Sequence, residues 1–261
     1  MSQLDVIQFS HLVLGLWYPF VRIMAFLQYG PIFDSKAFSM RMRIRIIIAL
    51  ALAVILTPLV NPPVPGGLLN LHTIILTVEQ ILWGVLFGLM MQFLYLTLQL
   101  AGQILSFNMG MSMAVMNDPN SGASTTVLAE FIYIYAAILF FAMDGHLLLV
   151  SILYKGFIYW PPGSALLPQT LRSVSLALGW VFSSAMLLAL PATFIMLIVQ
   201  GGFGLLNRIS PALNLYSLGF PIAMLAGLIC FAALLSALPD HYLQLVNRVL
   251  AEFDALRRTH G

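Results

Sequence analysis

Long apolar segments, separated by short polar or proline-rich links, dominate the pattern of this chain. Six of them cover residues 6–33, 44–60, 73–107, 125–153, 172–200 and 212–238. At about 1.5 Å per residue in a helix, such segments are long enough to cross an apolar layer roughly 30 Å thick. The pattern therefore predicts an all-α membrane protein with six crossing segments.

The composition agrees with a membrane protein and excludes most soluble classes. Of the 261 residues, 61% are hydrophobic and 8% are charged, whereas an average soluble domain carries about 25% charged residues. The net charge of +2 gives no indication of nucleic-acid binding, and the single cysteine, Cys230, excludes an intrachain disulfide. Because the histidines lack metal-ligand spacing and no catalytic motif is present, we expect neither an enzyme nor a metal or cofactor.

The basic residues do not fit a simple membrane topology. Lys36, Arg41, Arg43 and Arg45 lie in or beside the first link, which places that link in the cytoplasm by the positive-inside rule. Six crossings then place the basic residues of the tail on the opposite side, against the rule. Either a crossing is miscounted, or some segments are not ordinary lipid-facing spans.

The segment 73–107 is too long for one crossing, because a single helix of this length would run about 50 Å. It carries a stripe of polar and small residues on one helical face, at spacings of three and four. The stripe consists of Gln80, Gly84, Gly88, Gln92, Tyr95, Gln99, Gln103 and Ser106. Two interpretations stay open: close helix packing through Gly84-xxx-Gly88, or a polar seam that lines a pore or contacts other subunits.

Several ionisable residues lie inside or beside apolar segments, where each charge costs about 2.5–3.5 kcal/mol on insertion scales. Glu130 and Asp144 are 14 residues apart, which predicts two carboxylates on one side of one helix. They could pair with basic residues of a neighbouring chain, relay protons, or lie at an interface. His146, after the helix-weakening Gly145, is expected to be hydrogen-bonded.

The last two apolar segments carry ladders of small residues at a spacing of four, namely Ser175, Gly179, Ser183 and Gly219, Ala223, Gly227. Between the two segments, the glycine-rich residues 201–214 predict a turn in which Arg208 is the only charge, with either no special role or a docking role. The tail, residues 239–261, predicts an amphipathic helix that lies on a membrane or docks on a partner.

The segment 107–122 combines methionine, glycine and turn-forming residues. Met109, Met111 and Met113 alternate, which does not fit a helical spacing of three and four, and Asp118-Pro119 favours a turn. Methionine adapts its shape to irregular gaps, and irregular backbone at membrane depth survives only inside protein or beside a water-filled cavity. The pattern indicates either a loop inside a conduit or an ordinary loop that packs on its own protein.

Several short motifs occur in an order that resembles the FliR/SctT family of export-gate membrane proteins. They are Phe107–Met113, Met116–Pro119, Phe140–His146, Pro161–Gly163 and Asn207–Asn214, followed by Phe220-Pro221. The likeness covers nearly the whole chain. The forms of the Met116–Pro119 and Asp144–His146 motifs favour the flagellar branch over the injectisome branch.

The resemblance implies a subunit of the flagellar type III export gate in the bacterial inner membrane, at the flagellar basal body. Such a subunit assembles with FliP-like and FliQ-like subunits into a pore, lifted largely out of the lipid plane, with an FlhB-like subunit at its cytoplasmic entrance. Unfolded flagellar proteins pass through it. Residues 1–171 would be FliP-like, 172–238 a FliQ-like helical hairpin, and 239–261 the C-terminal helix.

The resemblance also implies that the segment 107–122 plugs the closed pore. The expected plug residues are Phe107, Met109, Gly110, Met111, Met113, Met116, Asp118 and Pro119. The residues expected to contact other subunits or to be buried are Gln92, Gln99, Gln103, Glu130, Asp144, His146 and Arg208. The alternatives are an injectisome SctT-type subunit and a self-sufficient secondary transporter, although no internal repeat typical of transporters is present.

Overall fold

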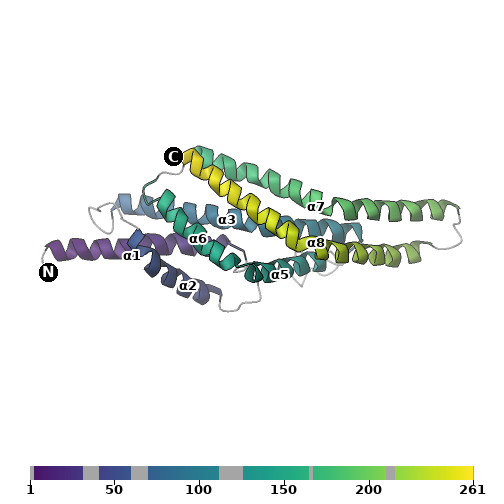
Figure 1. The fold of residues 1–261 in the computed structure, drawn as a ribbon, viewed down its shortest axis with the longest axis horizontal. Helices are drawn as coiled ribbons and strands as arrows, with labels where there is room; N and C mark the ends of the chain where they lie inside the picture. Colours follow the sequence, from purple (N-terminus) through teal and green to yellow (C-terminus); the bar gives the residue numbers. More distant parts are fainter. Residues whose placement is uncertain are drawn as a thin grey trace. The chain divides into compact units, whose positions relative to one another are not determined.

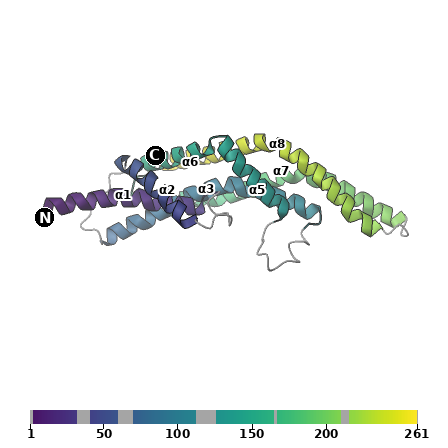
Figure 2. The same ribbon diagram turned by 90° about the horizontal axis from the view of Figure 1, so that it is seen from below.

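The computed structural model describes residues 3–31, 41–59, 70–111, 126–164, 167–209 and 215–260. Within these ranges every regular element is a helix, and no strand occurs (Figures 1 and 2). The predicted all-α membrane class is therefore confirmed. The helices are α1 (Gln3–Tyr29), α2 (Arg41–Leu56), the 3-10 turn η1 (Thr57–Leu59), α3 (Leu71–Asn108), α5 (Val127–Ala142), α6 (Gly145–Tyr159), α7 (Pro168–Ile209) and α8 (Leu215–His260).

Fewer helices than expected are suited to crossing a membrane. In the described part of the chain, α3, α7 and the Gly219–Arg258 part of α8 are long and apolar enough, and α5 with α6 could form a fourth span. The apolar part of α2, Ile44–Leu56, is too short, because such a helix rises only about 20 Å. By length and composition, the described helices therefore offer three or four spans, fewer than the six crossing segments that the sequence predicted.

The break between α5 and α6 corrects the prediction for the two carboxylates. The two helices meet at an angle of 74°, and Asp144 between them has a left-handed backbone with φ 55°. A residue in this conformation cannot continue a right-handed helix. Glu130 on α5 and Asp144 therefore do not line one side of one helix, and they belong to different compact units.

The chain forms two compact units, each assembled from distant parts of the sequence. The first unit contains Met1–Gln92, Phe141–Leu176 and Val249–Gly261, and the second contains Phe93–Phe140 and Ala177–Arg248. The predicted boundaries at 171/172 and 238/239 concern likeness to other subunits, so they stay predictions. Residues 239–260, expected as a separate helix, continue α8 without a break.

In the first unit, α1 lies along the first half of α3 (Figures 1 and 2). A Cβ atom on Gly84 would lie 2.3 Å from the carbonyl oxygen of Arg22, and one on Gly88 would lie 2.8 Å from that of Phe26. Real Cβ contacts are longer, so only glycine permits this approach. At Gly84 and Gly88, the polar and small stripe of the segment 73–107 therefore serves close helix packing, the first of its two interpretations.

The buried Arg22 connects α1 to the end of α6. Its guanidinium donates hydrogen bonds to the carbonyl oxygens of Gly156 (3.1 Å) and Trp160 (2.7 Å). It also lies 4.3 Å from the ring centre of Phe157. These bonds offset part of the cost of removing the cation from water, which an unbonded buried charge would carry in full.

In the second unit, the end of α3 packs on α5 through another glycine. A Cβ atom on Gly102 would lie 2.8 Å from the Ile132 side chain and 2.9 Å from the Cα atom of Ala129. Tyr95 and Tyr133 contact each other in the same interface, with ring centres 5.7 Å apart. This packing holds the last turns of α3 in place.

Helix α7 corrects the prediction of a turn at residues 201–214. The helix continues to Ile209, so Gly201, Gly202 and Gly204 are helical, and residues 210–214 lie outside the described part. Glycine lowers helix stability by about 1 kcal/mol relative to alanine but does not forbid a helix. An apolar helix of this length tolerates such residues, so their presence does not fix where it ends.

Candidate functional site

The candidate site begins at the C-terminal end of α3, where the predicted plug segment starts. The helix closes with two bonds, from the Gly110 N–H to the Phe107 carbonyl and from the Met111 N–H to the Ser106 carbonyl, both 3.0 Å. Gly110 has φ 77°, a left-handed conformation that favours glycine. These features define a Schellman helix end. The helix therefore stops at Asn108, where the methionine alternation predicts that regular helix is lost.

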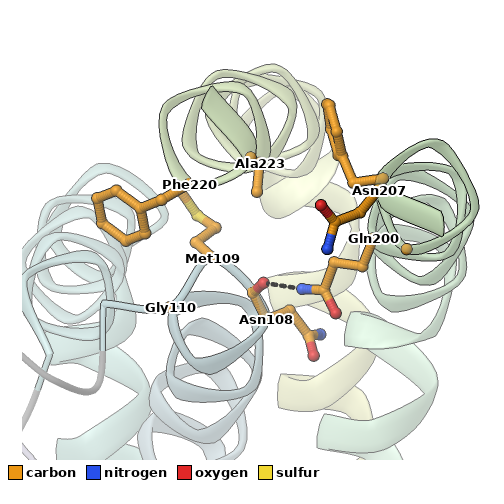
Figure 3. A pocket seen from close by; sticks show the side chains of 10 residues that line it. Asn108, Met109, Gly110, Gln200, Asn207, Phe220 and Ala223 are labelled. Carbon is orange, nitrogen blue, oxygen red and sulfur yellow. Dashed lines mark hydrogen bonds between the residues drawn. The ribbon is translucent and has the colours of Figure 1, made fainter. Parts of the chain in front are cut away.

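Met109 is anchored on α8 by a notch that glycine provides. Its side chain is 1% exposed, and it lies so close to Gly227 that an added Cβ atom would overlap it at 2.2 Å. Phe220, two turns earlier on α8, lies beside Gly110 (Figure 3). The small-residue ladder of the last apolar segment thus receives the first methionine of the predicted plug.

Asn108 attaches the same helix end to α7. Its side-chain amide donates to the hydroxyl of Thr193 (2.9 Å), and its backbone carbonyl accepts a bond from the Gln200 amide (2.6 Å; Figure 3). The carbonyl is one of the last four of α3, which lack a partner inside the helix. Two polar side chains of α7, Thr193 and Gln200, therefore form hydrogen bonds with the last residue of α3.

A pocket of about 600 Å³ lies beside these contacts, within the second unit. The amides of Asn108, Gln200 and Asn207 and the rings of Phe203 and Phe220 line it (Figure 3). Among the described residues, the lining contains hydrogen-bonding groups but no ionisable side chain. Such a lining suits the packing of a peptide segment.

The structure describes only part of the predicted plug. Phe107 is exposed on the last turn of α3, Met109 is buried, and Gly110 and Met111 are half-buried in the turn. Met113, Met116, Asp118 and Pro119 lie outside the described residues. The role of the plug residues stays a prediction.

The polar residues predicted for subunit contacts do not form one cluster. Gln92, Gln99 and Gln103 are half-buried along α3, whereas the other four are exposed: Glu130 on α5, Asp144 between α5 and α6, His146 on α6 and Arg208 at the end of α7. The ring of His146 stacks on Phe141 at 6.2 Å. Their role in subunit contacts also stays a prediction.

The α7 residues that attach to the end of α3 were not among the predicted site residues. Thr193 and Gln200 are seven residues apart, close to two helical turns, and they face the end of α3 from 85 and 92 residues away. Their spacing on an otherwise apolar helix was the available signal. Nothing in one sequence indicates that Asn108 is their partner.

The chain resembles proteins of bacterial export systems. The family described as bacterial export proteins, family 1, matches residues 13–249. The flagellar biosynthetic protein FliR of Pectobacterium carotovorum is 32% identical over 92% of this chain and 90% of its own length. FliR of Escherichia coli K12 is 30% identical over 93% of each chain. The surface presentation of antigens protein SpaR of Salmonella typhimurium is 26% identical over 68% of this chain and 67% of its own.

The family match extends from α1 into α8 and therefore includes both compact units and the whole candidate site. The relatives align over most of their own length, so the likeness concerns the complete fold and not one motif. The predicted resemblance is thereby confirmed, and the chain belongs to the bacterial export proteins, family 1, the family of the FliR proteins.

Proposed function

We propose that this chain is a pore-forming subunit of the flagellar type III export gate in the bacterial inner membrane, through which unfolded flagellar proteins pass. The observation that carries the proposal is the match to flagellar FliR proteins over more than nine-tenths of the chain. The apolar helices support a location in the membrane. In this proposal the chain has a structural role and catalyses no reaction.

The poor burial of α7 and α8 supports assembly with FliP-like and FliQ-like subunits. In the most apolar 18-residue windows, 50% of α3 residues are buried, but only 28% of those of α7 and 22% of those of α8. The ladder of Ser175, Gly179 and Ser183 is exposed, and Gly179 has no neighbour within 4 Å. Small residues on an open face permit the close approach of a sister helix.

Arg208, in the last turn of α7, is exposed. A cation at a helix C-terminus is favoured by the helix dipole and remains available to an acidic partner. We place the FlhB-like subunit at this end of the α7–α8 pair, at the cytoplasmic entrance of the gate.

The segment 107–122 closes the channel in this proposal. Its first residues emerge from a firmly capped helix, and Met109 is anchored on Gly227. Because the segment is anchored at its first residues, its later residues can move while Met109 stays attached. Methionine side chains suit a seal that must give way, because they repack without a fixed shape.

Deletion of residues 110–119 tests the plug. We expect resting membranes that contain the assembled complex to leak small ions, measured as conductance across a planar bilayer. A complex that assembles normally but shows the conductance of the unmodified protein would refute the sealing role.

Replacement of Met109, Met111 and Met113 with serine provides a finer test. We expect a larger leak than from serine at three exposed leucines of α7, Leu176, Leu187 and Leu197, each 67% exposed. Equal leaks from the two triple variants would indicate general destabilisation instead of a lost seal.

An injectisome subunit of the SctT type is the second candidate, favoured by the match to SpaR. That match is less extensive than the matches to the flagellar proteins. Complementation separates the two, because a flagellar subunit restores motility to a bacterium that lacks its own FliR. A stable monomer that transports a small solute would instead support a secondary transporter.

A further inference from the structure

Helix α2 has an outer face on which every exposed residue between Ile44 and Leu56 is apolar. The helix packs on α1 within the first unit (Figure 1), and its buried residues recur at spacings of four, four and three, namely Arg45, Ala49, Ala53 and Leu56. The large side chains that point outward are Ile44, Ile46, Ile47, Leu50, Val54 and Ile55. A continuous apolar face of this kind favours contact with another apolar surface.

The composition of this face favours acyl chains over a sister helix. Helix interfaces inside membranes are enriched in small residues, which let two backbones approach, and in side chains that form hydrogen bonds between helices. The open face of α7 carries such residues, Ser175, Gly179 and Ser183. The outer face of α2 carries large and mostly β-branched aliphatic side chains, and none of its exposed side chains can form a hydrogen bond. Flexible lipid tails adapt to such a surface, whereas the backbone of another helix is kept at a distance.

The length of the apolar face corresponds to one leaflet of a bilayer. The apolar part of α2 is Ile44–Leu56, and the helix rises about 16 Å between the first and the last of the outward isoleucines. The hydrocarbon layer of a bilayer is roughly 30 Å thick, so one leaflet contributes about half of it. The face is therefore too short to cross the membrane but long enough to cover one leaflet.

The first end of α2 has the chemistry of a membrane surface. Arg41 and Arg43 belong to the first turn of the helix. Arg45 donates a hydrogen bond to the side-chain oxygen of Gln28, near the end of α1, and the neighbouring Tyr29 is exposed. Basic residues and tyrosine are enriched where hydrocarbon meets the polar head groups of lipids. This end of the helix therefore suits contact with phosphate groups.

The other end of α2 has polar groups whose hydrogen bonds are made inside the protein. The Thr57 hydroxyl donates to a backbone carbonyl one turn earlier (2.7 Å). Thr57 also lies beside α1, since a Cβ atom on Gly15 would be 3.6 Å from its methyl group. The exposed Trp17, two residues further along α1, donates its indole N–H to the Thr77 hydroxyl (3.2 Å). Hydrocarbon offers no hydrogen-bond partner, so groups already bonded in this way can enter it at low cost.

We propose that α2 inserts into one leaflet of an anionic phospholipid bilayer, with its basic first turn at the phosphate groups and Ile55 in the hydrocarbon. Acyl chains cover the outer face of the helix. The absence of Asp, Glu, Lys and Arg from residues 46–78 agrees with this orientation, because charges inside an apolar layer are costly. The inference goes beyond the export-gate function and does not depend on it, since it requires only a membrane around the first unit.

The test measures how deeply two positions of α2 lie in the bilayer. In the full chain with Cys230→Ala, either Ile47→Cys or Ile55→Cys carries a small fluorophore; the two isoleucines are 66% and 68% exposed, so the label does not disturb packing. The protein, with the partners that co-purify, is reconstituted into vesicles of phosphatidylcholine and phosphatidylglycerol whose chains are brominated near the head group or near the methyl end. We expect the shallow bromines to quench the label at position 47 more strongly and the deep bromines to quench the label at position 55 more strongly.

A second measurement tests the basic end. Brominated phosphatidylglycerol should quench the label at position 47 more than brominated phosphatidylcholine does, because each basic residue enriches anionic lipid about fivefold. Arg41→Gln with Arg43→Gln should remove this preference, and Arg257→Gln with Arg258→Gln, which removes the same charge from the end of α8, should keep it.

Absence of quenching at both positions would overturn the proposal, because it would show that a protein surface covers α2. The same depth at positions 47 and 55 would also overturn it. So would a preference for phosphatidylglycerol that persists without Arg41 and Arg43, or that is lost equally in the α8 control.

Discussion

The contact between α1 and α3 depends on Gly84, so replacement of this residue with alanine should separate the two helices. An alanine Cβ atom would lie 2.3 Å from the Arg22 carbonyl oxygen and 2.7 Å from the Ala25 Cβ atom. Both are fixed to the α1 backbone and cannot rotate away. The first unit can accept the added methyl group only if one helix moves.

The expected magnitude follows from two opposing contributions. Alanine stabilises a helix by about 1 kcal/mol relative to glycine. Overpacking of a close contact costs about 1–3 kcal/mol, and the upper end applies because the obstructing atoms belong to the backbone. The net loss is about 2 kcal/mol. For a chain of this size, it lowers the midpoint of thermal unfolding by about 4–8 °C.

Gly15→Ala is the matched control, because Gly15 lies on α1 in the same unit and an added Cβ atom would meet only the Thr57 methyl group at 3.6 Å. This is an ordinary van der Waals distance, so the control should keep or raise the thermal midpoint. Both variants are compared by circular dichroism in the same detergent. If Gly84→Ala is as stable as Gly15→Ala, the helices are not in the close contact described.

Two other changes have clear expected outcomes. Arg22→Leu should cost about 2 kcal/mol, because it leaves the buried Trp160 carbonyl without its donor; faster hydrogen exchange at the end of α6 would show this, and unchanged exchange would contradict it. Gly227→Ala should displace Met109 and destabilise the protein. Adding Met109→Ala should recover part of that loss in a double-mutant cycle, whereas additive losses would show that the two residues are not coupled.

The features that the sequence predicted well depend on neighbours along the chain. The long apolar segment at 73–107 forms one helix, and Gly84-xxx-Gly88 lies in a close helix contact. The alternation of Met109 and Met111 correctly indicated where that helix ends. In each example, the residues that form the sequence pattern are also the residues whose structure it predicts, within a few helical turns.

The features that the sequence did not predict depend on conformation or on distant partners. Asp144 adopts a left-handed backbone, which non-glycine residues visit only occasionally, so the spacing from Glu130 suggested a continuous helix. The glycines near 201 favoured a turn, yet α7 continues through them. Arg22 lies inside the first apolar segment, but its hydrogen-bond partners lie 134 and 138 residues away.

Burial differs among the three long apolar helices α3, α7 and α8, and this difference bears on what covers each helix. Half of the apolar window of α3 is buried within the chain, but less than a third of those of α7 and α8. In a membrane, apolar contact alone gives helices little reason to associate, since lipid tails are equally apolar. Exposed small residues such as Gly179 are therefore better evidence for a sister helix than exposed leucines are.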